Sequence, residues 1–319
     1  TLFRSVRAVS DDITVIRRGA VVGTASPDES ENELANKMVG RAIMLKVEKE
    51  EAKPAGGGLC FDKVSLLGSA GNTILDHVSL EVERGEVVAV AGVQGNGQTE
   101  LAEAILGLVN PDSGSITLEG VDITHAGPRK SLDAGIGFIP EDRSTDGIIA
   151  GFSISENLIL DQFDKAPFAA GPALRLGVIE KNAKALEEEY DIRLTSIEDP
   201  ISSLSGGNQQ KVVVARELSK DLNLLVANQP TRGVDVGSIE FIHKQIVSVR
   251  DQGTPVLLIS SELDEVVALA DRIAVMYRGR IMGVVAPDTP REVLGLMMAG
   301  VPLEEALASQ SDSTQEEAR

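Results

Sequence analysis

The segment Leu204–Lys211, with the sequence LSGGNQQK, has the composition of a polar loop that opens a helix. Ser205 is a good helix cap, and the glycines Gly206 and Gly207 let the backbone lie close to another group. The first amides of such a helix have no intrahelical partner and carry the positive end of the helix dipole, so they suit an anion. An ordinary capped turn is the alternative interpretation, and the segment alone does not exclude it.

A second glycine-rich segment follows the continuously apolar run Val87–Ala91, which is typical of a buried parallel strand. A strand, a glycine loop and a following helix form the context of a phosphate-binding loop. Gly92 and Gly97 have the spacing of G-x-x-x-x-G-K-S/T, with Gln98 in place of the lysine. The dinucleotide-binding pattern fits less well, because it requires a glycine where this chain has Gln94.

The chain contains an internal repeat. Residues 6–40 match residues 266–300 at a constant offset of 260 and without gaps, so that Asp11, for example, pairs with Asp271. Each copy is expected to form two strands joined by an Arg-Gly turn and then a short helix. Two unrelated hairpins are the alternative, but the ungapped identities argue against them. The sequence therefore predicts a tandem protein, of which this chain carries one whole unit and the last strands of the unit before it.

Four regions are expected from this repeat and from local composition. Residues 1–47 are the C-terminal tail of a preceding domain, and residues 48–58, which are charged and then rich in Pro and Gly, form a linker. Residues 59–303 form the complete domain, with a helical subdomain at about 145–203. Residues 304–319 are expected to be a disordered acidic tail.

The complete domain is expected to have an α/β fold. The apolar runs Val87–Ala91, Leu222–Ala227 and Val256–Ser260 predict buried strands, and they alternate with segments of helical pattern. Such alternation is typical of a wound mixed sheet. Alternating polar and apolar residues at Leu59–Ser65 and Val78–Val82 predict a half-exposed β part before the first buried strand.

The composition argues against several classes of function. A net charge of −19 over 319 residues argues against binding nucleic acid or an anionic membrane as the main task, because both need a basic face. Cys60 is the only cysteine, so no intrachain disulfide can form, as expected in a reducing cytoplasm. No apolar run reaches the length of a membrane span. We therefore expect a soluble protein that can still dock on a membrane protein.

Taken in order, these segments resemble the nucleotide-binding domain of ABC transporters over residues 59–300, which implies a P-loop NTPase-like sheet with an antiparallel β part and a helical insertion. The segment Leu204–Lys211 is similar to the signature motif of that family, and the glycine loop lies at its Walker A position. Glu141 falls at the Q-loop, Asn228 and Gln229 fall in Walker B, and Ser261 lies at the switch-histidine position.

Three motifs, PEDR, LSGGNQQK and QPTRGVD, together resemble the tandem ATP-binding subunits that import simple sugars or nucleosides. Gly151–Leu158 and Ile239–His243 favour the nucleoside branch. The resemblance implies ATP and Mg²⁺ as cofactors and two domains paired head to tail. Each ATP then lies between the Walker motifs of one domain and the signature motif of the other.

The resemblance also assigns two sets of residues. Those that would bind nucleotide in the domain's own pocket are Gly92, Gln94, Gly95, Asn96, Gly97, Gln98, Thr99, Glu141 and Asn228, with Thr99 as the metal ligand. Those that would contact the partner domain's nucleotide are Ser205, Gly206, Gly207 and Gln209. Gln229 and Ser261 occupy the positions of the catalytic base and of the switch residue.

The domain's own pocket departs from the family pattern at each chemical task of ATP hydrolysis. Gln98 replaces the lysine, and a neutral hydrogen bond is worth about 0.5–1.5 kcal/mol against about 1.5–3 for a charged one, so affinity should fall roughly tenfold. Asn228 replaces the acid that orders Mg²⁺. Gln229 replaces the glutamate that polarises water, and Ser261 replaces the histidine. We expect weak or absent ATP and Mg²⁺ binding without turnover.

An alternative for the same pocket is that Gln98, Asn228 and Gln229 simply satisfy one another's hydrogen bonds. The three histidines, His77, His125 and His243, are too scattered in sequence to indicate a metal site or a replacement base. They are expected to be surface or partly buried residues.

Three functions stay open at this point. The first is the ATP-binding subunit of an importer, peripheral on the cytoplasmic face of the plasma membrane. Its partners would be the preceding nucleotide-binding domain, the membrane permease and, indirectly, an extracellular substrate-binding protein, with no nucleic acid. The second is a non-hydrolytic regulatory or dimerisation module. The third is a soluble ABC protein that acts on ribosomes or DNA, against which the acidic charge argues.

Overall fold

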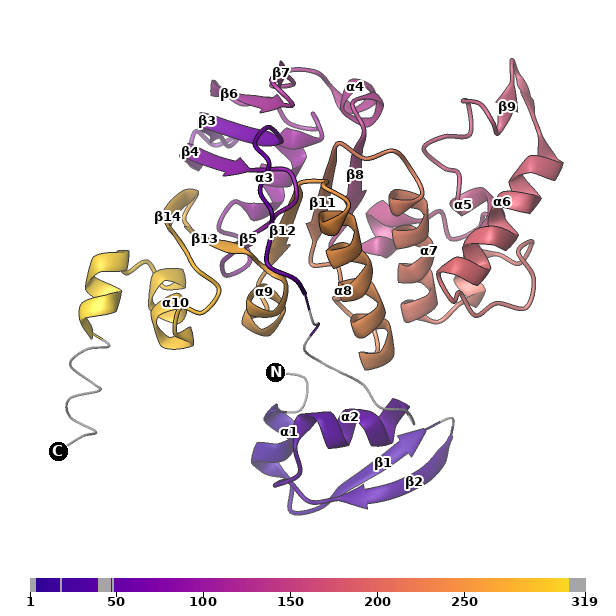
Figure 1. Ribbon diagram of the computed structural model, residues 1–319, viewed down its shortest axis with the longest axis horizontal. Coiled ribbons are helices and arrows are strands. Elements are labelled where there is room, and N and C mark those ends of the chain that lie inside the picture. Colours follow the sequence, from indigo (N-terminus) through magenta and orange to yellow (C-terminus); the bar gives the residue numbers. More distant parts are fainter. Residues whose placement is uncertain (1–3, 18, 40–46, 48, 310–319) are drawn as a thin grey trace.

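The computed structural model describes residues 4–17, 19–39, 47 and 49–309 (Figure 1). Its central sheet has six strands in the order β14–β13–β5–β12–β11–β8. Neighbouring strands are parallel except at the edge, where β14 runs antiparallel to β13. The strands are β5 (Val87–Ala91), β8 (Ile136–Ile139), β11 (Leu224–Asn228), β12 (Val256–Ser260), β13 (Arg272–Tyr277) and β14 (Arg280–Val285).

The central sheet is buried on both faces, which explains the continuous apolar runs of its inner strands. Alternate residues of β5 enter two separate hydrophobic cores, with Val87 and Ala89 on one face and Val88 and Val90 on the other. The predicted mixed α/β fold is therefore confirmed. The predicted bounds of β5 and β12 are those observed.

A four-stranded antiparallel sheet covers one face of the central sheet. Its strands in order are β4 (Thr73–Val82), β3 (Leu59–Leu67), β6 (Ser113–Leu118) and β7 (Val121–Asp122). Helix α3 (Gln98–Ile105) contributes Leu101 and Ile105 to the core that these two sheets share. The short helix α4 (Pro128–Asp133) precedes β8.

Helices cover the other face. They are α7 (Gly206–Leu218), α8 (Val236–Asp251), α9 (Leu263–Leu269) and α10 (Arg291–Met298). The expected helical subdomain lies beside α7, at the end of the molecule opposite α10 (Figure 1). It contains η1 (Arg143–Gly147), α5 (Ile154–Asn157), β9 (Ala169–Ala170), β10 (Ala173–Leu174), α6 (Leu176–Glu189) and η2 (Ile201–Ser203). The hairpin β9–β10 was not predicted.

The internal repeat has the same geometry in both copies. The first copy forms α1 (Arg4–Val9), β1 (Ile13–Arg17), β2 (Ala20–Ala25) and α2 (Glu31–Val39), and α1 corresponds to α9. Val15 pairs with Gly23, and Val275 pairs with Gly283, which is the same register at the offset of 260. The register shift that follows Val15 recurs after Val275.

The two copies differ in their surroundings. Strand β13 pairs with β5, whereas among the described residues β1 pairs only with β2. Ile16 is consequently 63% exposed, while its counterpart Met276 is buried. The first copy packs instead on α8, where Leu34 and Ala35 contact Val236 (Figure 1).

Two segments between and after the copies are more ordered than their composition predicts. In the expected linker, the Lys49 ammonium donates to the carbonyls of Leu269 (2.9 Å) and Ala270 (2.6 Å) at the end of α9 and to the Asp271 carboxylate (2.8 Å). The expected disordered tail is wrong for its first part, because residues 303–309 are helical. Ala306 is buried there, and this apolar contact stabilises the helix. The rest of the predicted tail, 310–319, lies outside the described residues.

Candidate nucleotide site and signature segment

The loop between β5 and α3 has the backbone of a phosphate-binding loop. Gly95 (φ +88°) and Gly97 (φ +102°) are left-handed, which turns successive amides toward one side. Gly97 is the N-cap residue of α3, and no side chain in the described part of the chain caps that helix. A Cβ atom at Gly97 would lie 2.9 Å from the Ile74 carbonyl oxygen, so the position requires glycine. The uncapped amides of α3 are therefore available to an anion.

Gln98 is buried beneath this loop. Its side-chain nitrogen Nε2 has no hydrogen-bond partner among the described residues. A Cβ atom at Gly92 would lie 2.7 Å from that nitrogen, so the amide lies directly against the loop backbone. An unsatisfied buried donor costs about 1–3 kcal/mol. A phosphate oxygen is an acceptor that would satisfy it, and the loop therefore fits the phosphates of a nucleotide.

Two neighbours hold the loop in place. Asn96 accepts hydrogen bonds from the amides of Arg278 and Gly279, both 2.9 Å, in the turn between β13 and β14. Gln94 donates to the Glu141 carboxylate over 2.7 Å. Glu141 also forms an ion pair with Arg232, so it connects the loop to the segment after β11.

Gln229 and Ser261 form a neutral pair at the ends of β11 and β12. The Gln229 amide donates to the Ser261 hydroxyl over 3.1 Å, and Gln229 has a left-handed backbone with φ +48°. The alternative in which Gln98, Asn228 and Gln229 satisfy one another is wrong, because Gln98 Nε2 is unpaired and Gln229 bonds to Ser261. Neither member of the pair can accept a proton from water, so the pair offers no general base.

The positions that the resemblance assigns to Mg²⁺ in this pocket, Thr99 and Asn228, carry neutral side chains. Proteins usually bind Mg²⁺ through one or two carboxylates together with substrate phosphates. The described residues contain no group of three or more His, Cys, Asp or Glu side chains that could hold a metal ion. Asn228 is a buried neutral amide, and Thr99 offers a single exposed hydroxyl at the start of α3.

The signature segment Leu204–Lys211 opens α7, as predicted from its pattern, but Ser205 does not cap it. The Ser205 hydroxyl accepts a hydrogen bond from the Asn208 side chain (3.2 Å) and makes none to the helix amides. Within the described part of the chain, the amides at the start of α7 thus have no side-chain acceptor. Gln209 donates to the carbonyls of Ile201 and Leu204, so its amide group is already engaged within this domain.

The two signature glycines are explained by contacts inside the chain. A Cβ atom at Gly206 would lie 2.4 Å from the Arg143 guanidinium, and one at Gly207 would lie 2.4 Å from the Asp235 carboxylate. The group that requires close approach is therefore a side chain of the same domain. Sequence reasoning included Arg143 in the PEDR motif but assigned it no role.

A buried ionic cluster anchors the other end of α7. Glu217 accepts hydrogen bonds from Arg216 (2.8 Å), Lys220 (2.6 Å) and the Phe138 amide of β8 (3.1 Å). Burial alone raises the pKa of Glu217, but the Arg216 and Lys220 charges outweigh it, and the net pKa is lowered. The carboxylate is therefore charged at neutral pH.

The histidines lie in different environments. His77 and His125 are exposed, but His243 is buried, which corrects the expectation of a surface or partly buried residue. Its Nε2 lies 3.1 Å from Glu265, and Glu265 accepts a second hydrogen bond from Thr231 (2.7 Å). These contacts join α8, α9 and the segment after β11.

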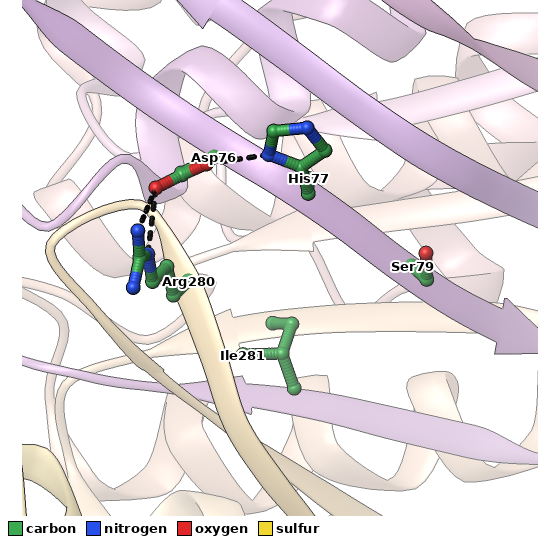
Figure 2. Close-up of a pocket in the computed structure, with 5 residues that line it drawn as sticks. All are labelled: Asp76, His77, Ser79, Arg280 and Ile281. Atoms are coloured by element: carbon green, nitrogen blue, oxygen red, sulfur yellow. Dashed lines mark hydrogen bonds and ion pairs between the residues drawn. The ribbon is translucent and has the colours of Figure 1, made fainter.

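An open hollow of about 380 Å³ lies on the surface of β4 and β14. Figure 2 shows the residues that line it. The Asp76 carboxylate contacts His77 over 2.6 Å and pairs with Arg280. These hydrogen bonds, that of His77 foremost, lower the pKa of Asp76. None of the predicted site residues lines this hollow.

Comparisons with known proteins agree with this geometry. Residues 75–232 match the family described as ABC transporter. A nucleotide-free ATP-binding cassette from an ABC transporter has a similar fold, with a TM-score of 0.63 and 23% identity, covering 79% of this chain and 99% of that one. Residues 75–232 thus match the ABC transporter family in sequence, and the fold of the chain is that of an ATP-binding cassette.

More similar in sequence are three import ATP-binding proteins. The guanosine import protein NupO of Bacillus subtilis (strain 168) is 45% identical over 93% of this chain and 59% of its own length. The nucleoside import protein NupA of Lactococcus lactis (subsp. cremoris, strain MG1363) is 45% identical over 92% of this chain and 59% of its own length. The glucose import protein TsgD13 of Haloferax volcanii is 45% identical over 92% of this chain and 54% of its own length. The chain thus spans less than two thirds of the length of these relatives.

Proposed function

We propose that this chain is part of the ATP-binding subunit of an ABC importer for nucleosides or simple sugars. Its signature segment completes an ATP site on a preceding domain, and its own pocket binds nucleotide weakly and does not hydrolyse it. Two observations carry the proposal. Gln229 and Ser261 form a neutral pair, and the first amides of the signature helix have no side-chain cap among the residues that the structure describes.

The different roles proposed for the phosphate loop and for the signature segment follow from the chemistry of each. The phosphate loop, with its glycines and the orphan amide of Gln98, would hold phosphates without supplying a charge. Neither Asn228 nor Gln229 is an acid, so Mg²⁺ and the attacking water are left unordered. In the partner site, ATP would supply the reacting phosphoryl group. Ser205 and the amides of Gly206 and Gly207 would contribute hydrogen bonds to it, a role that needs no titratable group.

The tandem arrangement is supported by the repeat. Strands β1 and β2 pair in the same register as β13 and β14. Strand β13 has β5 as its second neighbour, whereas β1 has no second neighbour among the described residues. We infer that a preceding domain of the same protein supplies that neighbouring strand and the catalytic Walker motifs. Residues 1–47 would then be its C-terminal tail, and the segment anchored by Lys49 would be the start of the connection between domains.

Partners and location follow from the proposed role. Two of the relatives named above are described as guanosine and nucleoside import proteins, which favours nucleosides over sugars as the transported class. No helix in the part of the chain that the structure describes is long and apolar enough to cross a bilayer. We infer that the subunit docks on a permease at the cytoplasmic face of the plasma membrane, with a substrate-binding protein on the other side.

Reconstitution tests this role. The longer protein that contains this chain is purified with a candidate permease and assayed for ATP turnover in membranes with and without nucleosides. Stimulation by a nucleoside supports the proposal, and stimulation by simple sugars alone moves the substrate to the second class. A protein that binds no permease and shows no turnover instead supports the regulatory or dimerisation module.

A further inference from the structure

Arg143 lies where three functional segments of this domain meet. It is the first residue of η1, directly after the capping residue Asp142. Its guanidinium donates to the Arg232 carbonyl (3.2 Å) and the Gly233 carbonyl (3.5 Å) in the segment after β11, and to the Gln209 side chain (3.5 Å) in α7. A single side chain therefore spans the PEDR motif, the segment that leads into α8, and the signature helix.

The packing on the signature glycines shows how closely these parts fit. A Cβ atom added at Gly206 would lie 2.4 Å from Arg143 Nη2. A Cβ atom added at Gly207 would instead lie against Asp235 and Ser238 at the start of α8. Neither glycine has a left-handed backbone, so alanine is acceptable to the backbone at both positions. Each glycine is needed because a particular side chain occupies the space.

A second chain of contacts reaches Arg143 from the phosphate loop. Gln94 bonds to Glu141, and Glu141 pairs with Arg232, whose carbonyl is one of the acceptors of Arg143. Glu141 and Arg143 are two residues apart, so the same short segment contacts both the phosphate loop and the signature helix. A displacement of this segment is thereby transmitted to both.

We propose that Arg143 is a positioning residue for the signature segment. Its guanidinium holds Gly206 and Gln209 against the Arg232–Gly233 backbone, and this sets the direction in which the first amides of α7 point. The importance of those amides for a partner site rests on the proposed function, but the positioning itself is a property of this chain alone. The Gln94–Glu141–Arg232 contacts connect that position to the domain's own pocket.

The test is hydrogen exchange, followed by mass spectrometry of peptides that cover residues 204–211, in the 319-residue chain without nucleotide. Arg143→Ala should speed exchange in this segment and leave the peptide over β5 unchanged. Gly206→Ala should do the same, because its methyl group displaces the guanidinium. Arg143→Ala combined with Gly206→Ala should exchange no faster than the faster single variant, since removing the guanidinium makes room for the methyl group. Contacting residues couple in this way by roughly twofold or more.

Gly207→Ala is the matched control. Its methyl group meets Asp235 and Ser238, so its effect should add to that of Arg143→Ala instead of being absorbed. Arg143→Lys should give an intermediate rate, because one ammonium cannot reach all three acceptors. If Arg143→Ala leaves exchange at 204–211 unchanged, or if its effect adds to that of Gly206→Ala as it does to that of Gly207→Ala, the assignment is overturned.

The same variants separate this inference from the proposed function. In the longer protein, Arg143→Ala should lower kcat for ATP more than it changes KM, in parallel with the loosened segment. Loosening of 204–211 with normal turnover contradicts the proposed role of the segment in trans and leaves the positioning intact. Unchanged exchange contradicts the positioning, whatever the turnover.

Discussion

The side-chain amide of Gln229 donates a hydrogen bond to the hydroxyl of Ser261 over 3.1 Å, and this bond joins the end of β11 to the end of β12. Both positions are predicted to carry the reactive groups of an ATPase, and both hold neutral side chains that satisfy each other. The orphan donor of this pocket is elsewhere, at Gln98 beneath the phosphate loop. The loop is therefore suited to hold an anion, and the Gln229–Ser261 pair offers no base to activate water.

Gln98→Lys should raise the affinity of the 319-residue chain for ATP roughly tenfold, because a charged hydrogen bond replaces a neutral one. Titration calorimetry with ATP measures this change. Val93→Lys adds the same charge to an exposed position of the same loop and should have a smaller effect. Equal gains from the two substitutions would mean that only the net charge matters and that Gln98 does not face the phosphates.

Gly97→Ala should destabilise the fold by roughly 2–4 kcal/mol, because a methyl group in a left-handed residue also meets the Ile74 carbonyl. Gly95→Ala has the left-handed cost alone, about 1–2 kcal/mol, since nothing lies within 4 Å of its Cβ position. Urea unfolding of the two variants makes the comparison. A larger loss at Gly95 is incompatible with the described loop.

Glu217 should give the fold an acid-sensitive contribution. Its pKa is lowered from about 4.5, so the stabilisation is complete above that value and is lost as the pH falls through the lowered pKa. Glu217→Gln should cost about 3–5 kcal/mol at pH 7, because Arg216 and Lys220 lose a buried partner. The difference from the parent protein should shrink below pH 4.5, which thermal unfolding across this range checks. A difference that stays constant with pH contradicts the assignment.

Lys49→Met should lower the free energy of unfolding by about 1.5–3 kcal/mol, because charged hydrogen bonds to the end of α9 are lost. Lys53 is the matched control, since its side chain is 85% exposed and pairs only loosely with Glu50. Lys53→Met should change stability by no more than about 0.5 kcal/mol. Similar small effects at both positions would mean that the connecting segment is not anchored by Lys49.

Much of the fold could be predicted, because it is encoded by local pattern. The runs at β5 and β12 are apolar at every residue, and both faces of these strands are buried. The repeat was visible as ungapped identities, and the structure extends them to the same strand register and the same irregularity after Val15 and Val275.

What could not be predicted depends on contacts between distant segments. Arg143 acts on α7 and on the segment after β11, and no local pattern places a guanidinium on Gly206. Serine is a common helix cap, but the Ser205 hydroxyl accepts a hydrogen bond from the Asn208 side chain and makes none to the helix amides. His243 has an ordinary helical context, and its burial follows from the packing of α8 on α9 near Glu265. The site residues themselves stay predictions until nucleotide binding is measured.

The most direct test of the central claim is ATP turnover by the longer protein that contains this chain and, as we propose, a preceding domain. We expect Ser205→Arg, which places a bulky side chain at the start of α7, to abolish turnover. We expect Gln229→Ala, which removes one member of the neutral pair, to change it little. Turnover that survives Ser205→Arg and is lost in Gln229→Ala would contradict the claim, because catalysis would then take place in this domain's own pocket.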